Sequence, residues 1–164
     1  MRLDGRDIKL LMALQAEGRI TNQKLADRVA LSPSACLERV RRLEAAGLIS
    51  GYGARVSLDK VLSTSTIFVE VTLKSHEAAD FDRFERSIRE APEVVECHAI
   101  GGGIDYLLKV VAGDIAHYQS IMERLLTAGI GIGQYFTYVV TKPVKTAAPY
   151  PLDTLIDRAR SQPA

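Results

Sequence analysis

The sequence predicts an α+β protein made of two folding units in series. Three short segments with helical spacing of apolar residues occupy the first 50 positions. From Gly51 the periodicity becomes alternating, and four strand-like segments are interrupted by two helical ones. A chain of 164 residues can form two small hydrophobic cores. We expect units at 1–50 and 64–145, a hinge strand and linker at 51–63, and a C-terminal arm at 146–164.

The first unit contains three helices with clear start and stop signals. Apolar residues from Ile8 onward have helical spacing, and Gly18 is a natural stop. Thr21 is a suitable N-cap for a short second helix. Ser32-Pro33 places a hydroxyl at the N-cap and a proline at the first position of a third helix, which is expected to run to Ala46. Three short helices with a tight middle turn are typical of a helix-turn-helix.

The second unit follows a β-α-β-β-α-β order, which is the ferredoxin-like arrangement. Helices are expected around Phe81–Ile88 and after Asp114, a suitable N-cap. A triple glycine separates the two middle strands. The four strands are expected at 67–74, 94–100, 104–112 and 135–141. Beyond them, three prolines precede a short possible helix at 152–160, which we expect to lie over another surface.

Composition favours a cytoplasmic protein without metal or cofactor. The net charge is +1, but residues 1–50 hold nine Lys/Arg against six Asp/Glu, so the positive excess lies in the first unit. No apolar run approaches membrane length, and no signal peptide is visible at the N-terminus. Cys36 and Cys97 are too few for a disulfide framework or a zinc site, and His98 points away from Cys97 on a strand. His76 and His117 lack ligand spacing.

The third helix presents one packing face and one polar face. At 100° per residue, Cys36, Leu37, Val40 and Leu43 share a side, and the opposite side is free to enter a DNA major groove. Its first residues would read bases, its arginines would reach phosphates or a guanine, and two cations of the second helix would hold the flanking backbone. The candidates are Ser34, Ala35 and Glu38 for bases, Arg39, Arg41 and Arg42 for phosphates, and Lys24 and Arg28 for the flanks. The alternative is a solvated face whose arginines pair with Glu38 and Glu44.

Two sets of segments resemble the Lrp/AsnC (feast/famine) family of transcription regulators. In the first unit they read GRITN at 18–22, LSPSACLERVRRLE at 31–44 and GLISGY at 47–52. In the second they read ECH at 96–98, DYLLKV at 105–110 and TYVV at 137–140. The resemblance covers about residues 3 to 145. It implies a winged-helix-like DNA-binding domain, adds Thr21, Asn22 and Ser32 to the candidate DNA contacts, and implies a ferredoxin-like, ACT-like domain of the RAM type that senses an amino acid.

The resemblance also implies homodimers that assemble into octamers, with effector amino acids bound between dimers. The sequence supports a dimer independently, because two helices cannot cover both faces of the sheet and one face would carry Phe68, Leu107, Val111, Phe136, Tyr138 and Val140. Two-fold symmetry then predicts a roughly palindromic operator on double-stranded DNA.

The family places the effector at the turn between the middle strands. In this chain the corresponding residues are Ile100, Gly101, Gly102, Gly103 and Asp105, with Thr137 and Tyr138 nearby. Glycine amides can bind a carboxylate and an aspartate can accept from an ammonium. The alternative is a loose hairpin in which Asp105 accepts N–H groups of its own loop. The sequence departs from the family at Gly103, where relatives often carry an acid.

Catalytic motifs are absent from the sequence. The triple glycine does not form G-x-G-x-x-G between a strand and a helix, and no phosphate loop is present. Two other functions remain open. An architectural protein would compact DNA without a ligand, and a regulatory sensing subunit would not bind DNA at all.

Overall fold

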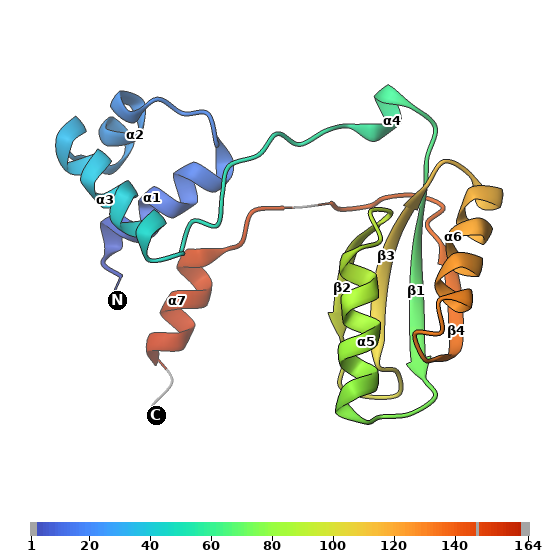
Figure 1. The fold of residues 1–164 in the computed structure, drawn as a ribbon. Helices are drawn as coiled ribbons and strands as arrows, with labels where there is room; N and C mark the ends of the chain where they lie inside the picture. The colour runs from blue at the N-terminus through green and yellow to red at the C-terminus, as the bar shows by residue number, and fades with distance from the viewer. Residues whose placement is uncertain (1–2, 147, 162–164) are drawn as a thin grey trace. The chain divides into compact units, whose positions relative to one another are not determined.

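The structure is a computed structural model that describes residues 3–146 and 148–161. The chain divides into two compact units, each of which is described by itself. The first unit combines the chain up to Arg55 with the segment from Lys145 onward, and the second comprises Val56–Val144. Figure 1 shows the helices of the first unit in blue and red and the sheet of the second in green to orange.

The first unit contains the three predicted helices: α1 (Gly5–Ala16), α2 (Asn22–Val29) and α3 (Pro33–Ala45). Both predicted caps are present, since the Thr21 hydroxyl accepts from the Lys24 amide and the Ser32 hydroxyl accepts from the Ala35 amide. Between α2 and α3 the chain turns at Ala30, whose φ of 53° is left-handed. The core of this unit is formed by Leu10, Leu25, Ala26, Val29, Cys36 and Leu43.

One residue expected on the packing face of α3 lies outside the core. Leu37 is 40% exposed, whereas Cys36 and Leu43 are fully buried. Leu37 follows Cys36 by one position and is turned about 100° from it, so the flank of the apolar stripe is left uncovered. The stripe that packs is therefore narrower than predicted.

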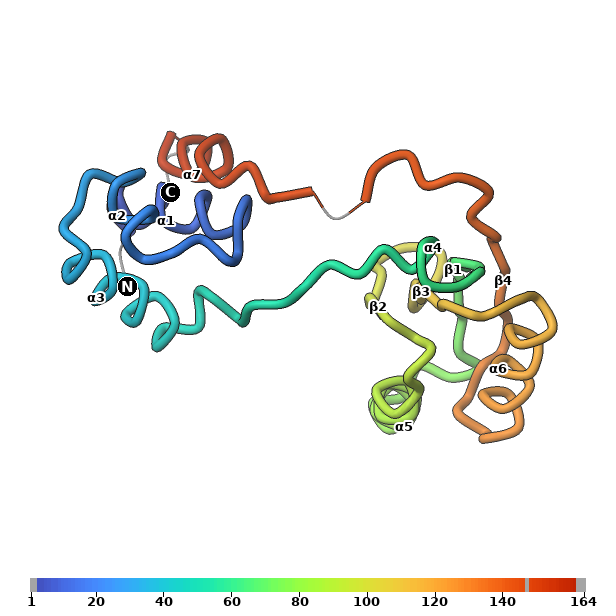
Figure 2. Tube along the Cα trace, turned by 90° about the horizontal axis from the view of Figure 1, so that it is seen from above, coloured from blue at the N-terminus to red at the C-terminus, as the bar shows by residue number. Residues whose placement is uncertain are grey.

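The C-terminal segment belongs to the first unit. It forms α7 (Leu152–Ser161), the short helix that the sequence predicts, and α7 contacts α1. Figure 2 shows α7 beside α1 from a second direction.

The second unit is the predicted β-α-β-β-α-β domain. Its elements are β1 (Ser65–Leu73), α5 (Ala78–Arg89), β2 (Val94–Ala99), β3 (Tyr106–Ala112), α6 (Ile115–Thr127) and β4 (Ile132–Val139). The sheet is antiparallel, with strand order β2-β3-β1-β4. Alternate residues of β1 and β3, from Ile67 to Leu73 and from Tyr106 to Ala112, are buried together with residues of both helices. The two helices therefore cover a single face of the sheet.

Two predictions about strands are wrong. No strand forms at 51–57, and the linker instead continues into the single turn α4 (Leu58–Val61). An extended segment becomes a strand only when a neighbour takes its backbone hydrogen bonds, and the described chain offers none there. The last strand begins at Ile132 rather than Tyr135, because β4 pairs with β1 as far as Ile132 opposite Leu73. Among the described residues, no helix is long and apolar enough to span a membrane.

Candidate functional site

The exposed face of α3 carries the residues predicted to read bases. Ser34 and Glu38 are exposed and Ala35 is half-buried. Arg41 is also exposed, and its guanidinium has no hydrogen bond or ion pair with the described residues. Because Ser32 caps the helix and the buried Cys36 and Leu43 fix its rotation, this face is presented outward on a rigid element.

The other two arginines of α3 are held by α1. Arg39 donates to Asp4 at 2.7 Å and to Asp7 at 2.8 Å. Arg42 donates to both oxygens of the Asp7 carboxylate, at 2.8 and 2.9 Å. Neither pairs with Glu38 or Glu44, the partners expected in the alternative interpretation. The three-arginine cluster is thus divided into two structural cations and one free cation, Arg41.

The acid that binds both arginines was missed from the sequence. The Asp7 carboxylate is only 1% exposed and completes a capping box with Asp4 at the start of α1. The spacing of Asp4 and Asp7 is the signal that could have located it. The hydrogen bond from the Asp7 amide, followed by that from Arg39, lowers the pKa of Asp4 to about 2.

The remaining candidates around α3 have local structural contacts. Thr21 and Ser32 are the caps, and the Asn22 amide donates to the carbonyl of Pro33 at 2.8 Å, which ties α2 to the start of α3. Arg28 pairs with Glu17 at 2.6 Å. Lys24 is exposed and its ammonium has no partner among the described residues. Lys24 and Arg41 are therefore the two predicted cations available to a phosphate.

The glycine turn between β2 and β3 is open to solvent. Gly101, Gly102 and Gly103 are exposed, and a Cβ on any of them would meet nothing within 4 Å. The φ of Gly102 is +149°, which L side chains rarely adopt. Ile100, beside this turn, donates its amide to the carbonyl of Asp105 at 2.8 Å.

Asp105 fixes the end of the sheet near this turn. Its carboxylate, 16% exposed, accepts the amide of Leu73 at 2.7 Å and lies 3.1 Å from the Nε2 of His76. Its own amide donates to the carbonyl of Val71 at 3.0 Å. The carboxylate is therefore engaged with the end of β1 and with the loop that follows β1, and not with amides of its own loop, as the alternative interpretation expected.

Thr137 and Tyr138 do not share a face of the sheet. The Thr137 hydroxyl lies 2.6 Å from that of Tyr118 on α6, on the helix-covered side. The Tyr138 hydroxyl donates to Glu70 at 3.0 Å on the opposite side, and this bond raises the pKa of Tyr138. Both lie on β4, which β1 separates from the glycine turn. The predicted effector residues are thus divided among three surfaces of one subunit.

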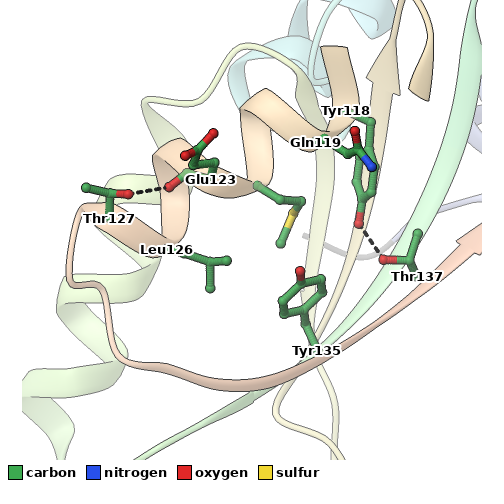
Figure 3. Close-up of a pocket in the computed structure, with 8 residues that line it drawn as sticks. Tyr118, Gln119, Glu123, Leu126, Thr127, Tyr135 and Thr137 are labelled. Carbon is green, nitrogen blue, oxygen red and sulfur yellow. Dashed lines mark hydrogen bonds between the residues drawn. The ribbon is translucent and has the colours of Figure 1, made fainter. Parts of the chain in front are cut away.

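A pocket of about 410 Å³ lies between α6 and β4 and includes Thr137 (Figure 3). Three of its hydroxyls are already engaged, since those of Thr137 and Tyr118 bind each other and that of Thr127 donates to the backbone carbonyl of Glu123. The side chains of Gln119 and Glu123 have no hydrogen bond with the described residues. The pocket is lined by Tyr118, Gln119, Met122, Glu123, Leu126, Thr127, Tyr135 and Thr137. No spacing in the sequence indicated it, because it joins two elements across the fold.

The face of the sheet opposite the helices is not covered by the described residues and carries large apolar side chains beside the charged Glu70. Phe68 of β1 pairs with Tyr138 of β4, and Leu107 of β3 lies in register with Glu70. Phe136 and Tyr138 are each 50% exposed. Such a face on a small domain is typical of a subunit interface.

The described residues contain no cluster of three or more potential metal ligands. Cys97 faces the helix-covered side opposite Leu108, whereas His98 is in register with Leu107 on the uncovered side. Cys36 lies in the core, where burial raises the pKa of its thiol.

Sequence profiles of two known domains match the chain. The profile of a winged helix-turn-helix DNA-binding domain matches residues 3–50, and that of the Lrp/AsnC ligand binding domain matches residues 66–150. The two matches correspond to the helical part of the first unit and to the sheet unit with the start of the C-terminal segment.

Individual relatives agree with these profiles. The chain is 50% identical over 145 residues to the transcriptional regulatory protein DoeX of Halomonas elongata, covering 88% of this chain and 92% of the relative. It is 40% identical over 143 residues to the leucine-responsive regulatory protein of Escherichia coli K12, covering 87% of each. A transcriptional regulator of Neisseria meningitidis, solved as a complex with L-Met, superposes with a TM-score of 0.87 at 36% identity, covering 94% of this chain and 99% of that one.

Proposed function

The chain belongs to the Lrp/AsnC family of transcriptional regulators, with a DNA-binding and an effector-binding domain, and on that premise we propose that it controls genes of amino-acid metabolism in response to an amino acid. Its relatives are regulators and not enzymes. It would act in the cytoplasm, on the nucleoid, and need no metal or cofactor beyond its effector.

The observation that carries DNA recognition is the division of the arginines on α3. Arg39 and Arg42 are bound to acids of α1, which fixes the helix, while Arg41 remains free on the exposed face beside Glu38 and Ser34. A helix held in this way can enter the major groove without losing its position. We assign base contacts to Ser34, Ala35 and Glu38, and a phosphate or guanine contact to Arg41.

The uncovered face of the sheet would be the dimer interface. Phe136 and Tyr138 are half-exposed there, and a second copy would remove this apolar area from water. A two-fold dimer presents two α3 helices and so reads a roughly palindromic operator. Assembly of dimers into octamers is a further part of the proposal.

The effector we propose is an amino acid bound at the glycine turn. The relative from Neisseria meningitidis binds L-Met, and the relative from Escherichia coli is named for its response to leucine. The open amides of Gly101, Gly102 and Gly103 would receive the carboxylate of the effector. Asp105 already binds Leu73 and His76, yet a carboxylate has about four lone-pair sites, so one remains for an ammonium.

A gel shift tests the function. The purified protein would be titrated on DNA upstream of its own gene and of the neighbouring gene, and on scrambled DNA, near physiological salt, with each of the common amino acids in turn. We expect selective binding that one amino acid changes. Equal affinity for specific and scrambled DNA would support an architectural protein instead, and absence of binding would support a sensing subunit.

Two variants distinguish the glycine turn from the pocket of Figure 3 as the effector site. Asp105→Asn removes the charge beside the turn, and Glu123→Gln removes the free charge of the pocket. In calorimetric titrations, Asp105→Asn should weaken the affinity of the protein for the active amino acid, and Glu123→Gln should leave this affinity unchanged. The reverse pattern would move the effector to the space between α6 and β4.

A further inference from the structure

The chain passes between the two units twice. It leaves the first unit after Arg55 and returns to it at Lys145, because α7 belongs with the N-terminal helices. The returning segment follows directly from β4 and contains Pro143, Pro149 and Pro151. Prolines restrict the backbone at their own positions, which limits the conformations open to the chain at these three points.

Several contacts hold α7 to α1. The amide of Tyr150 donates to the side-chain oxygen of Gln15 at 2.9 Å, and the guanidinium of Arg160 donates to the carbonyl of Leu3 at 3.2 Å. These bonds lie at opposite ends of α7. Between them, Leu152 and Ile156 are half-buried.

The two sides of α7 differ in burial. Leu152 and Ile156 are four residues apart and share one helical face, whereas Leu155 is 51% exposed. A helix of ten residues is marginal in water on its own, so α7 depends on a surface that covers its apolar face. In the structure that surface is α1 (Figures 1 and 2).

We propose that α7 is a docking helix for the DNA-binding domain, so that α1–α3 are attached to the sensing domain at two points. One attachment is the covalent linker after α3. The other is the non-covalent contact of α7 with α1, since α7 follows β4 of the sensing domain in the chain. The second attachment reaches α3 through Asp7, which binds Arg39 and Arg42.

Cleavage of the first linker isolates the second attachment. A site-specific protease sequence inserted between Gly53 and Ala54 would be cut in the purified full-length protein, where both residues are exposed. Size-exclusion chromatography then reports whether the N-terminal fragment stays with the remainder. The matched pair of variants is Ile156→Asp, on the half-buried face, and Leu155→Asp, on the exposed face of the same helix.

We expect the cut protein and its Leu155→Asp form to remain associated, and the Ile156→Asp form to separate. The proposal would be overturned if the N-terminal fragment separated from the remainder to the same extent in all three cut proteins. It would also be overturned if the fragment co-eluted with the remainder in all three. Hydrogen exchange of the uncut proteins checks that Ile156→Asp leaves α1–α3 and the sheet folded.

Operator binding gives a second readout, which rests on the proposed DNA-binding function whereas co-elution does not. If α7 keeps both DNA-binding domains on one dimer, cutting the linker should change operator affinity by less than about threefold. In the cut Ile156→Asp protein, operator affinity should fall about 100-fold, because the two DNA-binding domains are no longer linked and bivalent binding is lost. Equal losses in both would contradict the second attachment. Absence of operator binding in the uncut protein would instead refute the proposed function.

Discussion

The guanidinium of Arg42 on α3 donates two hydrogen bonds to the carboxylate of Asp7 on α1, at 2.8 and 2.9 Å. Arg39 donates to the same carboxylate at 2.8 Å. A buried acid thus holds two arginines of the helix that we assign to DNA recognition. This arrangement uses positive charge to orient α3 and leaves Arg41 to face outward.

Replacing Asp7 should loosen the DNA-binding domain. Asp7→Ala removes the acceptor of three charge-assisted hydrogen bonds and the second half of the capping box, so we expect the opening free energy of α1–α3 to fall by about 2 to 3 kcal/mol. Native-state hydrogen exchange is the suitable measurement, because a two-domain chain does not unfold in one step. Glu38→Ala, an exposed acid of α3, is the control and should leave protection unchanged.

Arg41 and Arg42 should affect DNA binding in different ways. Arg41→Ala should weaken operator binding about tenfold and lower the salt slope by about 1, with hydrogen-exchange protection of α1–α3 unchanged. Arg42→Ala should weaken binding together with a loss of protection, because its partner is Asp7. Unchanged affinity in Arg41→Ala would remove that residue from the interface.

The first helix should lose its cap only in strong acid. Asp4 has a pKa of about 2 in the folded chain, below its ordinary value of 3.8, because the Asp7 amide and Arg39 favour its charged form. A lowered folded pKa means that this stabilisation is complete above pH 3.8 and is lost as the pH falls through about 2. NMR titration of the Asp4 carboxyl carbon should give that midpoint. In Asp4→Asn the amide oxygen still caps α1 and this pH dependence should disappear. A midpoint near 3.8 in the wild type would contradict the contact with Arg39.

A charge on the uncovered sheet face should abolish dimerisation. Phe136→Asp places a carboxylate in register with Glu70, on a face that a second subunit would cover, so like-charge repulsion and burial of an unpaired charge should give a monomer in sedimentation. Tyr135→Asp is the matched control, since Tyr135 is adjacent on β4 but lines the pocket on the helix-covered side. If Phe136→Asp stays dimeric while folded, the interface lies elsewhere.

Asp105 should contribute separately to stability and to effector response. Asp105→Ala removes the acceptor of the Leu73 amide, and we expect the opening free energy near the glycine turn to fall by about 1 to 3 kcal/mol. Asp105→Asn keeps an acceptor for Leu73 but cannot pair with an ammonium by charge. It should therefore retain protection of β1 in hydrogen exchange and show a blunted effector response in the gel shift. A full response in Asp105→Asn would exclude the ammonium contact.

Local signals predicted most of the elements. The N-caps Thr21, Ser32 and Asp114 lie where the sequence indicated, and the ferredoxin-like order is confirmed. The prediction of a hinge strand was wrong, because a strand forms only beside a neighbouring strand and the alternating pattern at 55–57 does not specify one. The early start of β4 at Ile132 likewise depends on pairing with β1.

Side-chain partners distant in sequence could not be predicted from spacing. Arg39, Arg41 and Arg42 were all expected to contact phosphates, but Asp7, more than thirty residues earlier, binds Arg39 and Arg42 and leaves Arg41 free. Thr137 and Tyr138 were expected near one turn, yet the period of a strand sends them to opposite faces.

The sequence by itself determined the two units, the caps and the polar face of α3, because backbone propensity and apolar periodicity are local properties. Only the tertiary structure decided which arginine remains free, that Asp105 is bound by Leu73 and His76, and that α7 packs on α1. Those outcomes depend on charges and surfaces that folding brings together from distant parts of the chain, and such contacts leave no periodic trace in either partner.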